Sequence, residues 1–190
     1  MAKLICDTRE HNNLYILQDF DTLGVKYDVR KLDEGDYEST ANPNVVIDLK
    51  GGILEVQSNI AGKNEKRVRF LNECLRCITK QKTLIVLIRE PKIYSINGVQ
   101  YWKSPRDRNG RPFTKVSGKY IMEVMKSYTE NYGVIWEFCK PEEAAFAILR
   151  ILNKNGGKIY YDYEYANQLL VAKPARIQNS KWNITKRTRR

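Results

Sequence analysis

The run over residues 83–88 is the segment that most constrains the fold of this chain. It reads Thr-Leu-Ile-Val-Leu-Ile and contains no charged side chain. A short, continuously apolar run is typical of a strand that is buried on both faces. Such a strand needs helices on either side, and strand and helix patterns alternate from residue 45 onward. We therefore predict an α/β fold with a mixed central sheet that is flanked by helices on both faces.

The spacing of apolar residues predicts the other elements. Strands are expected over 3–6, 25–32, 45–49 and 133–138, and helices over 12–23, 64–80, 117–131 and 141–152. In the helix over 64–80, Val68, Leu71, Leu75 and Ile78 share one face and arginines occupy the other, which is the pattern of an amphipathic helix packed on a core. The length of 190 residues fits one domain. We place that domain at 1–155 and a basic C-terminal extension at 156–190.

Positive charge is concentrated in two segments. Of the net charge of +11, residues 173–190 contribute +7 without an acid and residues 92–119 contribute +6, so the remainder is near −2. Two basic segments on a nearly neutral body indicate binding to a polyanion. A solubilising tail is the alternative for residues 173–190. An anionic membrane surface fits less well because the tail has no amphipathic apolar face.

Membrane and secreted classes of protein are disfavoured. No apolar run approaches the ~20 residues that span a bilayer, and the first residues show no secretory signal. We therefore expect a cytoplasmic protein with no membrane partner. The four cysteines show no paired framework and are expected to be reduced. Cys74 and Cys77 lie in a predicted helix without further zinc ligands, so buried thiols are favoured over a metal site.

Two carboxylates and a lysine lie at predicted strand ends in the N-terminal part of the chain. Asp36 follows a glycine, and Asp48 and Lys50 close the strand over 45–49. The two-residue period of a strand points Asp48 and Lys50 to the same side. Two carboxylates can hold a hard divalent ion, and a nearby lysine can steer or activate a water on it. On a basic chain this predicts metal-dependent cutting of a phosphodiester backbone, although D-x-K also occurs by chance at exposed strand ends.

The ordered motifs resemble the nuclease domain of the XPF family, the flap and junction endonucleases of the PD-(D/E)xK superfamily. Residues 5–10, Ile-Cys-Asp-Thr-Arg-Glu, correspond to V-D-x-R-E, residues 32–37 to L-x-x-G-D-Y, and residues 48–50 to E-R-K. The likeness covers roughly residues 3–152 and implies a restriction-endonuclease-like fold. The chain departs from the pattern at Asp48, where the family has Glu, and at Glu73, where it has Gln. It also lacks the tandem helix-hairpin-helix domain that often follows.

The resemblance implies a metal site at these strand ends. Asp36 and Asp48 would ligate Mg²⁺ or Mn²⁺ together with the carbonyl of Leu49. Lys50 would position the attacking water or offset charge on the phosphorus.

The resemblance also implies catalytic support from the first motif. Asp7 would act through a water or a second ion. Arg9 and Glu10 would form a buried or half-buried pair that shapes the site, with a simple ion pair as the alternative. His11, the only histidine, is better explained as a surface residue than as a general base.

Candidate DNA contacts lie on the helix over 64–80 and in the basic loop over 92–115. Arg67 and Arg69 are candidate phosphate contacts, with a solvated helix face as the alternative. The loop mixes aromatic and basic residues, a composition that suits stacking on unpaired bases and gripping phosphates. Its candidates are Trp102, Lys103, Arg106, Arg108 and Arg111, beside Tyr101. A wedge at a DNA branch point is our hypothesis, and a merely flexible basic loop is the alternative. Trp182 in the tail could act similarly.

We therefore predict a Mg²⁺- or Mn²⁺-dependent endonuclease that acts on branched or flapped DNA. A small version without helix-hairpin-helix repeats resembles nucleases carried by bacteriophages, which would place it in a host cytoplasm. The resemblance also implies a possible homodimer through the helices over 117–131 and 141–152. The alternatives are a catalytically inactive partner subunit, a DNA- or RNA-binding module with structural acids, and a sequence-specific endonuclease.

Overall fold

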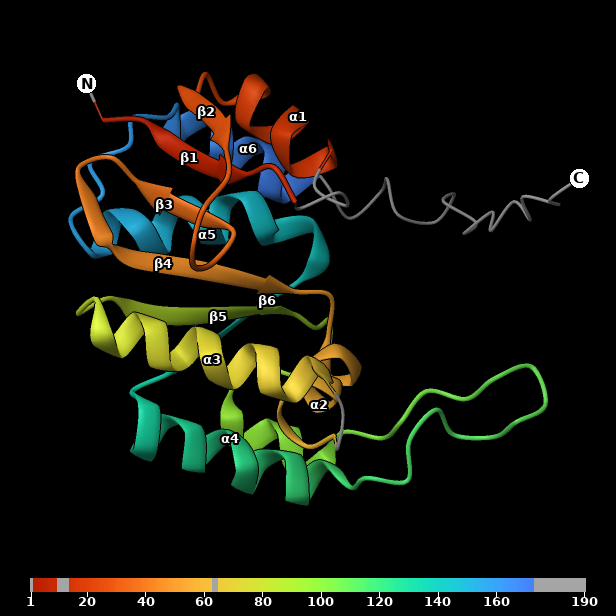
Figure 1. The fold of residues 1–190 in the computed structure, drawn as a ribbon. Coiled ribbons are helices and arrows are strands. Elements are labelled where there is room, and N and C mark those ends of the chain that lie inside the picture. Colours follow the sequence, from red (N-terminus) through yellow and green to blue (C-terminus); the bar gives the residue numbers. More distant parts are fainter. Residues whose placement is uncertain (1, 10–13, 63–64, 173–190) are drawn as a thin grey trace, which may run out of the picture.

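The computed structural model describes residues 2–9, 14–62 and 65–172, which form one six-stranded mixed sheet with helices on both faces (Figure 1). The strands are β1 (Leu4–Asp7), β2 (Tyr27–Arg30), β3 (Tyr37–Ser39), β4 (Asn42–Lys50), β5 (Thr83–Arg89) and β6 (Ile135–Cys139). Their order is β2-β1-β3-β4-β5-β6. β3 runs antiparallel to β1 and β4, and the other neighbours are parallel. The predicted α/β class and mixed sheet are confirmed.

One helical layer consists of α1 (Leu14–Thr22), α5 (Ala144–Lys154) and α6 (Tyr163–Ala172). A short 3-10 helix, η2 (Pro141–Glu143), leads into α5. Phe20 of α1 and Ile148 of α5 are fully buried in this layer, where they belong to the same core as Ile47 of β4 and Leu87 of β5. β4 is an interior strand, and its alternate residues Val45, Ile47 and Leu49 face this layer.

The other layer consists of α2 (Ile53–Ile60), α3 (Glu65–Thr79), α4 (Gly118–Tyr132) and the 3-10 helix η1 (Ile96–Tyr101). It packs on the opposite set of strand residues, which includes Val46 of β4 and Val86 of β5. The side chains at even positions of β4 therefore point toward α2 and α3. Neither α2 nor β3 was predicted, because each is too short to show a periodicity of its own.

The apolar face predicted for α3 is wrong. The helix buries Phe70, Cys74 and Cys77, whereas Val68, Leu75 and Ile78 are 59%, 45% and 49% exposed. Both stripes have helical spacing, so the sequence pattern alone does not choose between them. Packing decides, because the Phe70 ring lies 5.6 Å from the Tyr128 ring of α4 and 6.3 Å from the Trp136 ring of β6.

Residues 103–116 project from the body next to α2, and we call this segment the arm (Figure 1). A bridge pairs Arg106 with Pro112, and the Asp107 carboxylate accepts hydrogen bonds from the backbone N–H groups of Asn109 and Arg111 at 2.8 and 2.9 Å. The arm is therefore a hairpin with a tight turn.

Gly118 follows the arm and packs closely against the backbone of η1 and Trp102. A Cβ at this position would lie 2.2 Å from the Val99 carbonyl oxygen and 2.8 Å from that of Trp102, so no side chain fits without backbone movement. We predict that Gly118→Ala lowers the free energy of unfolding by about 3 kcal/mol, since overpacking against backbone is not relieved by a rotamer change. Urea denaturation measures this. Ser117→Ala, which removes only the cap that accepts from the Tyr120 N–H, should cost about 1 kcal/mol. Equal effects of the two changes would contradict the prediction.

Residues beyond 155 continue the folded domain. Ile159 and Ala166 belong to the core of the α1–α5 layer, and Asn153 exchanges hydrogen bonds with the backbone of Ile159 at 2.7 and 2.9 Å. The part of the extension at 156–172 is thus packed on the body, and the rest of it lies outside the described residues.

This packing bears on the expected homodimer. The apolar residues of α5 are buried within the chain itself. The exposed residues of α4 are mainly polar, among them Lys119, Glu123 and Glu130. Within the described residues α5 therefore keeps its apolar side chains inside the chain, and a homodimer through α4 and α5 stays a prediction.

All four cysteines are free and buried. Burial raises the pKa of the Cys74 and Cys77 thiols to about 12, which fits buried thiols rather than a zinc site. Among the described residues, no helix is both long and apolar enough to cross a membrane.

Candidate active site

The C-terminal end of β4 carries a buried ion pair. Asp48 and Lys50 are 4% and 9% exposed, and the Lys50 Nζ donates to Asp48 Oδ1 at 2.7 Å. Both side chains point toward α3, where the Lys50 ammonium lies 5.8 Å from the centre of the Phe70 ring. The two side chains share one face of the strand, as the two-residue period predicted.

The loop before β3 brings Asp36 to the same strand end. Asp36 Oδ2 accepts from the Leu49 N–H at 2.8 Å, and the backbone N–H of Asp36 donates to the Ile47 carbonyl at 2.6 Å. Gly35 has a φ of +67°, and a Cβ on it would lie 2.9 Å from the Ile47 oxygen. Only glycine fits this close approach, which is how the turn places Asp36 against β4.

The donor set at this strand end suits a hard divalent ion. The second oxygen of Asp48, Oδ2, is buried and has no hydrogen-bond partner among the described residues. The Leu49 N–H points to Asp36, and the carbonyl of a strand residue points to the same edge as its N–H, so the Leu49 carbonyl faces Asp36 as well. Two carboxylates and a carbonyl are oxygen ligands of the kind that Mg²⁺ prefers.

This set is small. Within the described part of the chain, no three His, Cys, Asp or Glu side chains come close enough to hold a metal ion by themselves. Mg²⁺ sites in phosphate-processing proteins usually have one or two carboxylates, with waters and substrate phosphate completing the coordination. The residues present fit an ion of that kind and do not fit a closed structural site.

The charge state of Lys50 limits its chemistry. Burial opposes its positive charge, but the negative charges of Asp48 and Asp36 and the hydrogen bond to Asp48 outweigh this, and the pKa of Lys50 is raised above its usual range. Lys50 therefore stays protonated at neutral pH. In this state it can donate hydrogen bonds and offset negative charge.

Glu73 of α3 also lies at the site, although it was noted only as a departure from the family motif. Its Oε1 accepts from the Gly35 N–H at 2.8 Å, so it helps to hold the turn before Asp36. Burial, together with the nearby charge of Asp48, raises the pKa of Glu73. The signal in the sequence was the motif position, since no local pattern connects Glu73 with Gly35.

A second acid, Glu34, anchors the same turn and was not predicted. Its side chain is fully buried, and its Oε1 accepts from Lys80 at 2.8 Å, with Arg76 at 3.4 Å and Lys82 at 3.7 Å from its oxygens. Arg76 lies on α3, and Lys80 and Lys82 lie between α3 and β5. The network therefore connects the turn to the helix layer. A buried carboxylate paired in this way fixes position more than it adds stability.

Asp7 is engaged by its neighbours. Its Oδ1 accepts from the Arg9 backbone N–H at 2.7 Å and from Arg9 Nε at 3.0 Å, and its Oδ2 accepts from the Leu32 N–H at 3.0 Å. Arg9 also donates to Asp7 Oδ2 and to the Leu32 carbonyl. The Arg9 guanidinium thus pairs with Asp7, while Glu10 and His11 lie outside the described residues. These contacts give Asp7 a structural task, and a role through water or a second ion remains a prediction.

The pairing of Asp7 predicts a pH-dependent stability. Burial acts to raise its pKa, but the hydrogen bonds from Arg9 and Leu32 outweigh burial and lower the pKa of Asp7. Its contribution is therefore fully present above the unfolded-state pKa, about 3.9, and is lost as the pH falls from there through the lowered pKa of the folded state. We predict that Asp7→Asn lowers the free energy of unfolding by about 2 kcal/mol at pH 7, and by much less near pH 3.

Urea denaturation at the two pH values checks this prediction. The matched control is Asp28→Asn, because Asp28 pairs with Lys3 at a half-exposed position and should change stability by less than about 0.5 kcal/mol. An Asp7→Asn effect that does not change with pH would show that the carboxylate charge is not what stabilises this turn.

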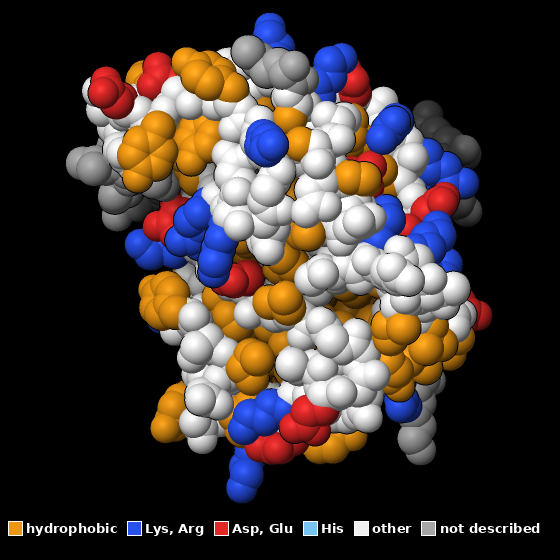
Figure 2. Space-filling view, turned by 90° about the vertical axis from the view of Figure 1, so that its left-hand side faces the viewer, with side chains coloured by type: hydrophobic (Ala, Val, Ile, Leu, Met, Phe, Trp, Pro, Cys, Tyr) orange, Lys and Arg blue, Asp and Glu red, His pale blue; other side chains and the backbone are white. Residues whose placement is uncertain are grey.

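The candidate DNA contacts fall into two groups. Arg67 and Arg69 are exposed on α3, where they line a shallow hollow with Val68 and Leu71. On the arm, the exposed cations are the predicted Lys103, Arg106, Arg108 and Arg111, together with Lys115. The face of the molecule away from the arm instead shows basic, acidic and hydrophobic side chains interspersed (Figure 2).

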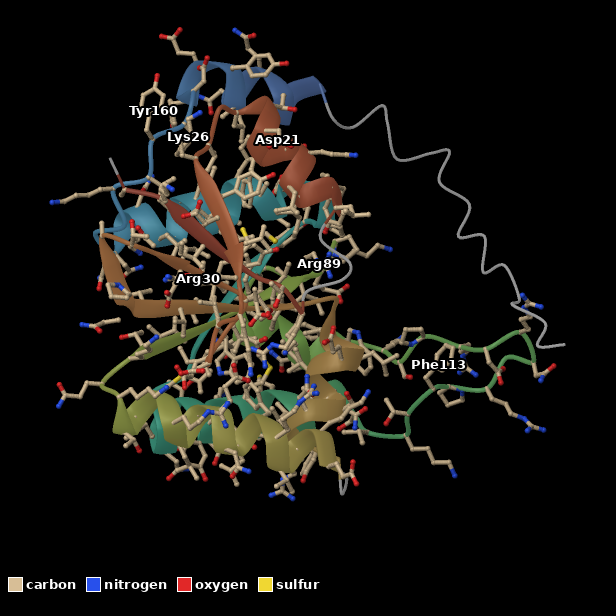
Figure 3. The ribbon with its side chains drawn as sticks, turned by 45° about the horizontal axis from the view of Figure 1, so that its top comes forward. Asp21, Lys26, Arg30, Arg89, Phe113 and Tyr160 are labelled. Atoms are coloured by element: carbon tan, nitrogen blue, oxygen red, sulfur yellow. The ribbon has the colours of Figure 1, made fainter. Side chains whose placement is uncertain are left out.

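Trp102 is partly buried and packs on the core of the α2–α4 layer. Its expected contact with DNA stays a prediction. The exposed aromatic side chains of the loop over 92–115 are Tyr94, Tyr101 and Phe113, at 64%, 78% and 62%. Phe113 lies on the arm between α2 and the tip (Figure 3). It was not singled out, because only the fold shows that it is exposed.

Comparison with known proteins identifies a similar structure. No family model and no curated protein matches the chain. Among solved structures, the chain is similar to the XPF from Aeropyrum pernix, with a TM-score of 0.54 and 16% sequence identity. The match covers 80% of this chain and 66% of that chain. The similarity shows an XPF-like nuclease fold, and the restriction-endonuclease-like architecture expected from the motifs is confirmed.

Proposed function

We propose that the protein is a Mg²⁺- or Mn²⁺-dependent endonuclease that hydrolyses the DNA backbone at flaps, forks or junctions. The observation that carries this proposal is the strand end of β4, where Asp36, Asp48 and Lys50 converge and the buried Asp48 Oδ2 has no described partner. Buried oxygens are rarely left without a partner, and a divalent cation would supply one here.

The residues of the site would have two roles, metal binding and hydrogen-bond donation. Asp36, Asp48 and the Leu49 carbonyl would hold the ion, which supplies a positive charge that activates water and stabilises charge on the phosphate. The Lys50 ammonium, held in place by Asp48, would donate to the water or to a phosphate oxygen. In the reaction the water oxygen bonds to phosphorus, the bond from phosphorus to the 3′ oxygen breaks, and the 3′ oxygen takes up a proton. The expected ends are a 5′-phosphate and a 3′-hydroxyl.

DNA would be gripped beside this site by the arm. The arm emerges next to α2, which directly follows the catalytic strand end (Figure 1). Its exposed cations suit contacts with phosphates, which position a nucleic acid without reading its sequence. This arrangement favours a nuclease that recognises DNA shape over one that recognises sequence.

The test is a cleavage panel with labelled linear duplex, 3′-flap, replication-fork and four-way-junction DNA, each in two unrelated sequences. We expect metal-dependent cuts at a constant distance from the branch in both sequences. Cuts at a fixed sequence on linear duplex would indicate a sequence-specific endonuclease. Binding without cutting in Mg²⁺ or Mn²⁺ would indicate an inactive or purely DNA-binding protein.

The grip of the arm predicts a change in salt dependence. Replacing Arg108 and Arg111 by glutamine should reduce the slope of log affinity against log salt by about 1.8, because each lost phosphate contact on duplex DNA removes about 0.9. Binding titrations at several salt concentrations measure the slope. The matched control replaces two exposed cations of α5, Arg150 and Lys154, and should leave the slope almost unchanged. Equal changes in both variants would mean that the arm has no special part in binding.

A further inference from the structure

A hollow beside the catalytic strand end has no role in the chemistry proposed above. It lies between α2 and the arm and measures about 550 Å³, within the ~300–1,000 Å³ range of ligand pockets. Its lining includes Gly51 and Gly52 after β4, Glu55 and Ser58 of α2, Lys66 of α3 and Phe113 of the arm. These residues come from four segments, so only the fold brings them together.

The hollow directly adjoins the catalytic residues. Gly51 follows Lys50 in the chain, and its N–H donates to Glu55 Oε2 at 2.7 Å, which fixes the start of α2 against the strand end. Gly51 and Gly52 place no side chain over the floor. These two glycines therefore add no side chain between the end of β4 and the hollow.

The walls offer two kinds of contact. Phe113 presents an exposed aromatic ring on the arm side, and Lys66 presents an exposed ammonium from the first turn of α3. The lining also contains the carboxylate of Glu55, whose Oε2 accepts from the Gly51 N–H. Single exposed aromatic residues are common on protein surfaces. Here the aromatic ring and the cation face one hollow next to the proposed cleavage site. This pair suits stacking on a base and contact with its phosphate.

We propose that this hollow holds one unpaired nucleotide next to the scissile phosphate, with its base on Phe113 and its phosphate near Lys66. The inference rests on the proposed nuclease function and specifies its substrate as DNA with an unpaired nucleotide at the cut. A base inside a duplex is stacked on both faces and cannot offer one to Phe113 without being extruded. Flapped or forked DNA has such a base at its branch, and fully paired duplex has none.

The test measures binding of the full chain in EDTA, so that cleavage plays no part. One DNA is a blunt duplex, and the other carries a flap whose first unpaired base is the fluorescent base 2-aminopurine. We expect the parent protein to quench this fluorescence by stacking. Phe113→Ala should abolish the quenching and weaken flap binding roughly 5- to 150-fold, with duplex binding almost unchanged. Phe113→Tyr should restore both, and Tyr120→Ala, at an exposed aromatic of α4, should match the parent.

Two results would overturn the subsite. Equal weakening of flap and duplex binding would make Phe113 a general contact, and unchanged flap binding and quenching would remove it from the interface. Cleavage in Mg²⁺ is scored separately. A parent protein that quenches but never cuts refutes the nuclease and retains the nucleotide site, whereas a parent that cuts while Phe113→Ala behaves normally refutes the nucleotide site alone.

Discussion

Replacing Asp36 by asparagine is expected to lower the single-turnover rate of metal-dependent DNA cleavage by about 10³-fold. The amide oxygen of asparagine can still accept from the Leu49 N–H, which Asp36 Oδ2 contacts at 2.8 Å, so the turn should keep its place. The change removes the negative charge that a hard divalent ion requires of its ligands. Affinity for uncut DNA should be almost unchanged, since the exposed cations of the arm are untouched.

The matched control for this variant is Asp33→Asn. Asp33 is three residues away in the same turn region, and its side chain is 74% exposed. It should cleave at the rate of the parent. If Asp36→Asn also cleaved at the rate of the parent, the Asp36 carboxylate would have no part in the reaction, and the metal site as drawn here would be wrong.

The second large effect concerns the stability of the ion pair between Asp48 and Lys50. Asp48→Asn leaves a buried ammonium without its closest partner, and Lys50→Met leaves a buried carboxylate. Each change should lower the free energy of unfolding by about 3 kcal/mol in the absence of divalent metal. The double variant removes both charges, and neutral pairs of similar volume are often as stable as a buried ion pair. We therefore expect its stability to lie within about 1 kcal/mol of the parent.

Urea denaturation of all four proteins in EDTA gives the coupling energy directly. A double variant whose loss equals the sum of the two single losses would show that the side chains do not stabilise one another, in conflict with their 2.7 Å contact. All three variants should be inactive in cleavage. A double variant that is stable but inactive would show that this pair is kept for function rather than for folding.

The strand end could be predicted from the sequence because its geometry is local. Asp48 and Lys50 are two residues apart on a regular β-strand, so the period alone places them on one face. The proximity of Asp36 is different, since it depends on the pairing of β3 with β4 and on the backbone approach at Gly35. It was reached only because the order of motifs resembles that of a known family.

The differences from the sequence predictions concern which side chains are buried, and tertiary packing decides this. α3 carries two stripes with helical spacing, and the contact of Phe70 with Tyr128 and Trp136 decides which one is buried. Trp102 lies in a segment whose aromatic and basic composition suits stacking, but its side chain packs on the core at the base of the arm. Phe113, a less conspicuous residue in the sequence, is the exposed one.

The contacts that hold the turn before Asp36 could not be predicted from the sequence, because they join residues that are distant in the chain. Glu34 is paired with Lys80, and Glu73 accepts from Gly35, across separations of 46 and 38 residues. Neither pair leaves a periodic signal in the sequence. Arg9 contacts Asp7, two residues away, and its expected pairing with Glu10 lies outside the described residues.

The most direct test of the central claim is cleavage of a labelled fork by the parent protein in Mg²⁺, in Mn²⁺ and in EDTA, with Asp48→Asn purified in parallel to exclude a contaminating nuclease. We expect cuts near the branch in either metal, none in EDTA, and none from the variant. Cuts that persist in EDTA or in Asp48→Asn, or an intact fork in both metals, would contradict the claim that this strand end is a metal-dependent nuclease site.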